Sequence, residues 1–268
     1  MTRLLASRLL RQPRGFTLVE LMVAMVAGLL VSAAVLSFFL SSMKSNGDYV
    51  QSTRLTQDLR NTLDLLTRDV RRAGSDDDAL RYVGNTNVSP FTPICLANGS
   101  STTCLGAGGT GNCLIYAYDR TYPNGGTTVT GTPGTLDTAT AEARGIRFRS
   151  VTNAEGRTVG VIEYARSSGG NRPHCDDAAA TYTSYPAACN GMWCPLSDPA
   201  KVDMTALTIV NNSQTIGVDP SALMERVFDF TLAGRIAGNT EFVRDVQTSL
   251  KIRSDCMRAT VTDCNARP

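Results

Sequence analysis

One acidic residue beside a long apolar segment is the most chemically unusual feature of this sequence. From Leu21 to Met43 no residue is charged, and this segment is longer than the roughly 20 apolar residues that a helix needs to cross a bilayer. Glu20 stands at its N-terminal end. An ionisable side chain at the end of a membrane helix is costly, so we interpret Glu20 as a functional residue that needs a partner.

The residues before the apolar segment predict its orientation. They contain no acid and four arginines, namely Arg3, Arg8, Arg11 and Arg14. Positive flanks stay in the cytoplasm, so everything after Met43 is expected outside it. A secretory signal peptide fits poorly, because its apolar region would be about 7–15 residues long with the small-residue cleavage site after it, whereas Ser32-Ala33-Ala34 lies inside this segment. A plain signal anchor leaves the string from Gly15 to Glu20 unexplained.

The eight cysteines favour disulfide bonds over a metal site. They form three groups: Cys95, Cys104 and Cys113; Cys175, Cys189 and Cys194; Cys256 and Cys264. An even number of cysteines outside the cytoplasm is typical of a disulfide-bonded domain. Cys256 and Cys264 flank a short loop after the last predicted strand and are the safest pair. If they pair, at least one bridge must join the two groups of three. A zinc site at His174-Cys175 with Cys189 and Cys194 matches no closed zinc spacing.

Other polar motifs do not indicate catalysis or a cofactor. Residues 106–111 fit G-x-G-x-x-G, but they precede a predicted strand, whereas the dinucleotide motif follows a strand and opens a helix. The acids at 76–78 are hard oxygen ligands suited to calcium, yet such a run is more typical of a solvated turn. His174 is the only histidine, so no histidine pair or triad can form. Trp193 is expected to pack. We therefore expect no enzyme, no cofactor and no metal.

The apolar segment continues into a second helical pattern. Apolar residues recur at steps of three and four, at Leu55, Leu59, Leu63, Leu66 and Val70, with charged residues between them. Gly74 stands where a helix-terminating glycine is expected. The pattern predicts one helix over residues 16–73, apolar on all sides in its first half and amphipathic in its second. A coiled coil would require a longer repeat, so the stripe is expected to pack on a β-domain.

The remaining residues, 75–268, predict one β-rich head domain. Gly, Thr, Asn, Ser and Pro dominate its connections, and 121–140 is expected to be a long exposed loop. Several segments alternate apolar and polar residues, as antiparallel strands with one buried face do. The predicted strands are 114–118, 145–151, 158–165, 205–210, 226–233 and 242–253.

The string Gly15-Phe16-Thr17-Leu18-Val19-Glu20 closely resembles the class III signal of type IV prepilins and pseudopilins. The resemblance implies that a prepilin peptidase cuts after Gly15 and methylates the new amino group of Phe16. It also implies that Glu20 is the assembly glutamate, which pairs with the amino group of Phe16 on a neighbouring subunit. The expected domains are then 1–15, a cleaved leader; 16–43, the transmembrane half of the helix; 44–74, its amphipathic half; and 75–268, the disulfide-bearing head.

The amphipathic half of the helix resembles the PilW family of type IV minor pilins. The run that carries the resemblance is Leu63-Asp64-Leu65-Leu66-Thr67-Arg68-Asp69-Val70-Arg71-Arg72-Ala73-Gly74. A related run occurs in J-type minor pseudopilins of type II secretion. Both families imply an α+β, pilin-like fold in which a long N-terminal helix packs on an antiparallel sheet.

Together these features predict a minor pilin that initiates a type IV pilus and sits at or near its tip. We expect it in the inner membrane, with the leader cytoplasmic and the head periplasmic, and later in the extracellular pilus. Its partners would be the prepilin peptidase, other minor and major pilins, and membrane lipid. The formal net charge of +2 belongs to the leader arginines, so no nucleic-acid partner is predicted. The alternatives are a minor pseudopilin of type II secretion and a membrane-tethered adhesin or DNA-uptake subunit, which would need a ligand groove.

Overall fold

A computed structural model provides the fold of the chain. It describes residues 15–82, 88–120, 122–124, 128–130, 132–178, 182, 189, 191–218, 223–239, 242–257 and 261–268. The predicted leader, apart from Gly15, and parts of the predicted 121–140 loop lie outside these residues. The chain forms two compact units, Met1–Val50 and Gln51–Pro268. The second half of the helix therefore belongs to the same unit as the sheets. The cleavage and domain boundaries expected from the sequence stay predictions.

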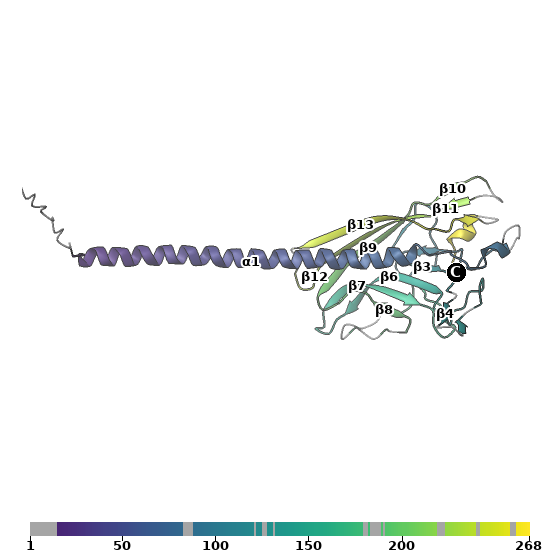
Figure 1. The fold of residues 1–268 in the computed structure, drawn as a ribbon, viewed down its shortest axis with the longest axis horizontal. Helices are drawn as coiled ribbons and strands as arrows, with labels where there is room; N and C mark the ends of the chain where they lie inside the picture. Colours follow the sequence, from purple (N-terminus) through teal and green to yellow (C-terminus); the bar gives the residue numbers. More distant parts are fainter. Residues whose placement is uncertain are drawn as a thin grey trace, which may run out of the picture. The chain divides into compact units, whose positions relative to one another are not determined.

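Helix α1 (Leu18–Val70) is continuous (Figure 1) and ends close to the predicted position. Beyond it the turn tightens, because the N–H groups of Arg72 and Ala73 donate to carbonyls three residues back. Gly74 then adopts φ 76°, the left-handed conformation that ends many helices. A Cβ there would lie 2.5 Å from Arg226 Nη2, so glycine is also required for space. Arg226 is buried and donates to the carbonyls of Thr92 and Ser254, and burial lowers its pKa to about 10.

Two antiparallel sheets form most of the second unit. The five-stranded sheet has the order β1-β3-β6-β7-β8, and the four-stranded sheet has the order β13-β12-β9-β2. The first comprises β1 (Cys95–Ala97), β3 (Cys113–Ala117), β6 (Ala143–Thr152), β7 (Thr158–Arg166) and β8 (Trp193–Pro195). The second comprises β13 (Val243–Lys251), β12 (Val227–Ile236), β9 (Val202–Asn211) and β2 (Thr110–Gly111).

Smaller elements complete the unit. A three-stranded sheet contains β10 (Gln214–Ile216), β11 (Leu223–Glu225) and β14 (Cys256–Met257), and a two-stranded sheet contains β4 (Tyr122–Asn124) and β5 (Thr128–Thr130). Short 3₁₀ helices lie at η1 (Ala79–Tyr82) and η2 (Val261–Asn265). Each of the six predicted strands corresponds to an observed one, namely β3, β6, β7, β9, β12 and β13. The unpredicted strands have only two or three residues, which is too short for alternation to be visible.

The helical stripe is buried in the head, as expected. Leu59, Leu66 and Val70 are fully buried in one core with residues of both large sheets, such as Ile146 of β6 and Phe230 of β12. Figure 1 shows the second half of α1 running between strands of these sheets. Burying each such side chain contributes about 1.5–3 kcal/mol. The α+β, pilin-like fold predicted from the sequence is confirmed, with the stripe packed on sheets instead of in a coiled coil.

Candidate functional site

The segment from Gly15 to Thr17 precedes the first turn of α1 and is open to its surroundings. A Cβ placed on Gly15 would meet no atom within 4 Å. The Phe16 side chain is 86 % exposed. The Gly15–Phe16 bond is therefore accessible at the start of the helix, as a processing site must be.

Glu20 is held by the residue that starts the helix. The backbone N–H and the hydroxyl of Thr17 both donate to Glu20 Oε2 at 3.1 Å, and the Glu20 N–H donates to Thr17 Oγ1 at 3.2 Å. This reciprocal arrangement is a capping box, and it places the carboxylate at the helix N-terminus, where negative charge is favourable. This role of Thr17 is not among the expectations drawn from the sequence, although the spacing Thr-x-x-Glu is a signal for it.

The apolar side chains in the first half of α1 are not covered by other described residues of the chain. Leu29 is 72 % exposed and Phe38 is 76 % exposed. By length and composition, α1 is able to span a membrane. A contiguous apolar surface of this size needs to be covered by lipid or by another protein.

The second half of α1 is tied to the five-stranded sheet through Asp69. The hydroxyls of Tyr116 and Tyr118 donate to the two oxygens of Asp69, each at 2.6 Å, and the Tyr164 hydroxyl donates to Oδ2 at 3.2 Å. Arg144 contacts the Tyr164 hydroxyl, and its guanidinium carbon lies 5.1 Å from the ring centre of Tyr118. The last turn of the helix is thereby hydrogen-bonded to Tyr116 in β3, to Tyr118 just after β3 and to Tyr164 in β7.

The tyrosines around Asp69 remain hydrogen-bond donors. Burial, and then the charge of Asp69, raise the pKa of Tyr116 well above its usual value. The same causes raise the pKa of Tyr118. Both hydroxyls therefore stay protonated at physiological pH and continue to donate to Asp69.

All eight cysteines are paired. The bridges are Cys95–Cys104, Cys113–Cys175, Cys189–Cys194 and Cys256–Cys264. The bridge between Cys256 and Cys264 is the pair that the sequence favours most, and Cys113–Cys175 is the expected bridge between the two groups of three. The zinc alternative does not fit, because the sulfurs of Cys175, Cys189 and Cys194 are in disulfides. His174 instead accepts from Arg267, with Nη1 2.9 Å from Nδ1.

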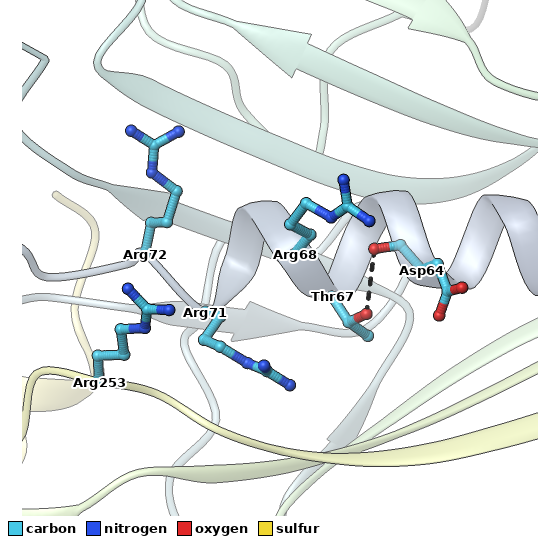
Figure 2. Close-up of a pocket in the computed structure, with 6 residues that line it drawn as sticks. All are labelled: Asp64, Thr67, Arg68, Arg71, Arg72 and Arg253. Atoms are coloured by element: carbon cyan, nitrogen blue, oxygen red, sulfur yellow. Dashed lines mark hydrogen bonds between the residues drawn. The ribbon is translucent and has the colours of Figure 1, made fainter.

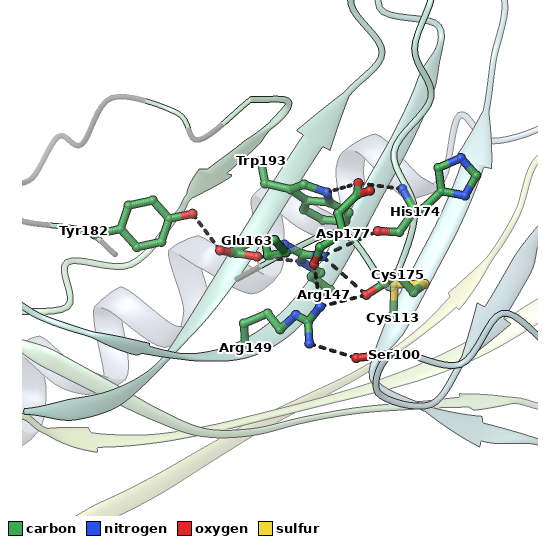
Figure 3. A network of polar contacts seen from close by, with 11 residues as sticks. Ser100, Cys113, Arg147, Arg149, Glu163, His174, Cys175, Asp177, Tyr182 and Trp193 are labelled. Atoms are coloured by element: carbon green, nitrogen blue, oxygen red, sulfur yellow. Dashed lines mark hydrogen bonds and ion pairs between the residues drawn. A yellow bond between two sulfur atoms is a disulfide. The ribbon is translucent and has the colours of Figure 1, made fainter. Parts of the chain in front are cut away.

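A buried ion pair organises the chain around Cys113–Cys175 (Figure 3). Arg147 Nε lies 2.6 Å from Glu163 Oε2, and both side chains are almost completely buried. Arg147 also donates to the carbonyls of Cys175 and Asp177, at 3.3 and 2.7 Å. The Tyr182 hydroxyl donates to the other oxygen of Glu163 at 2.6 Å. A buried charge pair is tolerated when such additional bonds satisfy both partners.

Trp193 closes this network, in the packing role that the sequence predicts. Its ring centre is 4.0 Å from the guanidinium carbon of Arg147, and its Nε1 donates to Asp177 Oδ2 at 2.7 Å. The loop that carries Asp177 is therefore held through both its backbone and its side chain. The network thus holds strands β6, β7 and β8 and the loop of Asp177 together within the head.

The remaining sequence motifs have structural explanations. Within residues 106–111, strand β2 forms at the end, and a Cβ on Gly111 would lie 2.2 Å from the carbonyl oxygen of Ala97. Strand β3 follows, so this segment lacks the helix of a dinucleotide site. In the acidic run, the Asp78 N–H donates to Asp76 Oδ1 at 2.8 Å within a turn, and the Asp77 N–H donates to Asp119 at 3.4 Å.

Two family models match the chain. One, described as "Prokaryotic N-terminal methylation motif", matches residues 10–36. The other, described as "Prepilin peptidase-dependent protein B", matches residues 48–252. No curated protein and no solved structure matches the chain significantly. The first model covers Gly15, Phe16 and Glu20, and the second covers the amphipathic half of α1 and both large sheets.

Proposed function

The chain belongs to the prepilin peptidase-dependent protein B family, and on this premise we propose that it is a minor pilin that initiates a type IV pilus and is incorporated at or near its tip. The methylation motif, the apolar helix and the disulfide-bonded head already make it a type IV pilin-like protein. The observation that carries the proposal is the exposed Gly15-Phe16 bond directly before the apolar helix. A prepilin peptidase would cut this bond and methylate Phe16.

Assembly would use the exposed first half of α1. Its apolar surface, which no other part of the described chain covers, would move from lipid to the helices of neighbouring subunits. Glu20 would exchange its bonds with Thr17 for the charged amino group of Phe16 on a neighbour. In a helix bundle of low dielectric constant such a pair offsets the cost of burying both charges and sets the axial register. This role is structural, with no catalytic step.

The resemblance of residues 63–74 to the PilW family supports a minor rather than a major pilin. We propose that the subunit waits in the inner membrane with its head in the periplasm, and that its partners are other minor and major pilins. The disulfides suit a head that is exposed outside the cell. Because J-type pseudopilins carry a related run, a minor pseudopilin of a type II secretion system is the second candidate.

Deletion of the gene tests both candidates in one strain. We expect few or no pili by electron microscopy and unchanged amounts of secreted enzymes in the medium. Re-expression of the wild-type chain should restore the pili, whereas Glu20→Ala should not. Normal pili together with a loss of secretion would instead identify a pseudopilin. Normal pili with normal secretion would contradict both.

A further inference from the structure

Four arginines gather around the C-terminal end of α1. They line a hollow of about 510 Å³ together with Asp64 and Thr67 (Figure 2). Arg68, Arg71 and Arg72 come from the last turn of the helix and the residues after it. Arg253 follows β13, and its backbone N–H donates to the Arg71 carbonyl oxygen at 3.3 Å. Two segments far apart in the sequence thus bring exposed guanidiniums to one place.

The surrounding chain compensates this positive charge only in part. Asp69 is engaged by three tyrosines, and among the described residues Asp64 is the one acid that lines this first hollow. The guanidinium carbon of Arg72 lies 4.7 Å from the ring centre of Tyr118. Within the described part of the chain, the guanidiniums of Arg68, Arg71 and Arg253 make no hydrogen bond or ion pair. Cations near a helix C-terminus are favourable, which accounts for part of the cluster. It does not account for Arg253, which comes from outside the helix.

A second hollow, of about 470 Å³, shares Asp64, Arg68 and Arg72 with the first and is also lined by Asp69, whose oxygens accept from the tyrosine hydroxyls. Along the helix, Asn61, Leu65, Arg68 and Arg72 recur at steps of three and four and so lie on one face. The opposite wall includes Tyr164 of β7. Leu65 is 51 % exposed between these polar residues. The two hollows together therefore combine an excess of arginines over the acids Asp64 and Asp69 with a tyrosine and one exposed leucine. Arginine and tyrosine are enriched at protein interfaces.

We propose that these two hollows dock an acidic amphipathic helix of another protein subunit. Positively charged side chains one helical turn apart, at 68 and 72, match carboxylates at the same spacing on a partner helix. Guanidiniums pair well with carboxylates because both are planar. An apolar residue next to these carboxylates, on the same face of the partner helix, would cover Leu65. A nucleic-acid backbone would use the arginines but would leave Leu65 uncovered.

The identity of the partner as another subunit rests on the proposed function, whereas the chemistry of the docking surface does not. The test therefore uses purified full-length protein in detergent and measures binding directly. The probe is a fluorescent helical peptide with glutamates along one edge and leucines beside them. Its matched control has glutamine in place of each glutamate. A labelled DNA duplex and anionic phospholipid vesicles are measured in parallel.

We expect the glutamate peptide to bind. The double variant Arg68→Gln with Arg72→Gln should weaken that binding on the order of tenfold, because the two proposed ion pairs are lost. Leu65→Ser should weaken binding of the same peptide. Arg54→Gln is the matched control, since Arg54 is an exposed arginine on the same helix outside both hollows. Melting curves should show that all variants remain folded.

Three results would overturn the proposal. They are equal binding of the glutamine peptide, an equal loss with Arg54→Gln, and arginine-dependent binding of DNA or vesicles without binding of the peptide. The last would assign the surface to phosphates. None of these results concerns cleavage at Gly15 or the pilus count, so they leave the proposed function separately testable.

Discussion

The two halves of α1 differ in how far the rest of the chain buries their apolar side chains and supplies partners for their acidic residues. In the first half, Leu29 and Phe38 remain exposed, and the side-chain partner of Glu20 among the described residues is Thr17, in its own turn. In the second half, Leu59 is completely buried and Asp69 accepts hydrogen bonds from three tyrosines of the head. The N-terminal half of the helix thus leaves apolar side chains for partners outside the chain to cover. Its C-terminal half is already packed in the core of the head. Changes in the first should impair processing and assembly, and changes in the second should impair stability.

The sharpest test of this separation is the replacement of Gly15 by valine. A bulky side chain at the cleavage position should block the peptidase, so only the full-length, membrane-bound precursor should accumulate. The wild-type protein should begin with methylated Phe16 by mass spectrometry. The melting temperature of the head should not change, because no atom lies within 4 Å of a Cβ at this position. A mature terminus within or after residues 21–43 would contradict the predicted processing.

Glu20→Ala should strongly reduce the number of pili while cleavage and membrane insertion continue. The reason is that the amino group of a neighbouring Phe16 would be left without its charged partner inside the helix bundle, where an unpaired charge is costly. Pilus counts and mass spectrometry on the same cells measure the two effects separately. Asp58→Ala is the matched control, an exposed acid in the second half of the same helix. A normal pilus count with Glu20→Ala would mean that no neighbouring Phe16 depends on it.

Arg147→Leu should have the largest effect on the head. It leaves Glu163, which is completely buried, without its charged partner, at a cost of about 3–5 kcal/mol of unfolding free energy. Arg157→Leu is the control, because its bridge to Glu155 is roughly half exposed and contributes at most about 1 kcal/mol. Denaturant unfolding measures both. Processing at Gly15 should be normal in each variant. Equal destabilisation by the two substitutions would show that the buried ion pair contributes no more to stability than the exposed one.

The disulfides should contribute according to the length of chain that they close. Replacing both Cys113 and Cys175 with serine opens a loop with a sequence separation of 62 and should cost about 4 kcal/mol, whereas the separation of 8 at Cys256–Cys264 predicts about 2–3 kcal/mol. Peptide mapping without reducing agent should first show both bridges in the wild-type protein. Free thiols at these positions would contradict the pairing, and an equal loss of stability would show that loop length does not decide the contribution.

Linear patterns predicted the helix and the longer strands. The leucine stripe and the alternation in β12 arise from neighbours within one element, so spacing alone reveals them. The cluster at Asp69 could not be predicted in this way, because Tyr116, Tyr118 and Tyr164 are brought together only by the pairing of β3 and β7 with β6. The same holds for Arg147 and Glu163, which face each other in the β6–β7 register.

The candidate site divides along the same line. Gly15, Phe16 and Glu20 are predicted site residues because they stand in one short contiguous string. The arginine hollow cannot be predicted in this way, because Arg253 is far from the helix in sequence. Thr17 is the exception. Its capping-box spacing with Glu20 is visible in the sequence, within the same string that resembles the processing signal.

The smallest expected effect lies at Thr17. Thr17→Val keeps the shape of the side chain but removes the hydroxyl that both donates to Glu20 Oε2 and accepts from the Glu20 N–H. Loss of such a cap costs about 1 kcal/mol, so amide hydrogen exchange in the first turn should be on the order of fivefold faster. Thr17→Ser retains the hydroxyl and should exchange like the wild type, and exchange in the head should be unchanged in both variants. If Thr17→Val did not alter exchange near Glu20, the capping box would not stabilise the first turn in solution. The order of that turn would then depend on partners outside the chain, as the burial of its apolar side chains does.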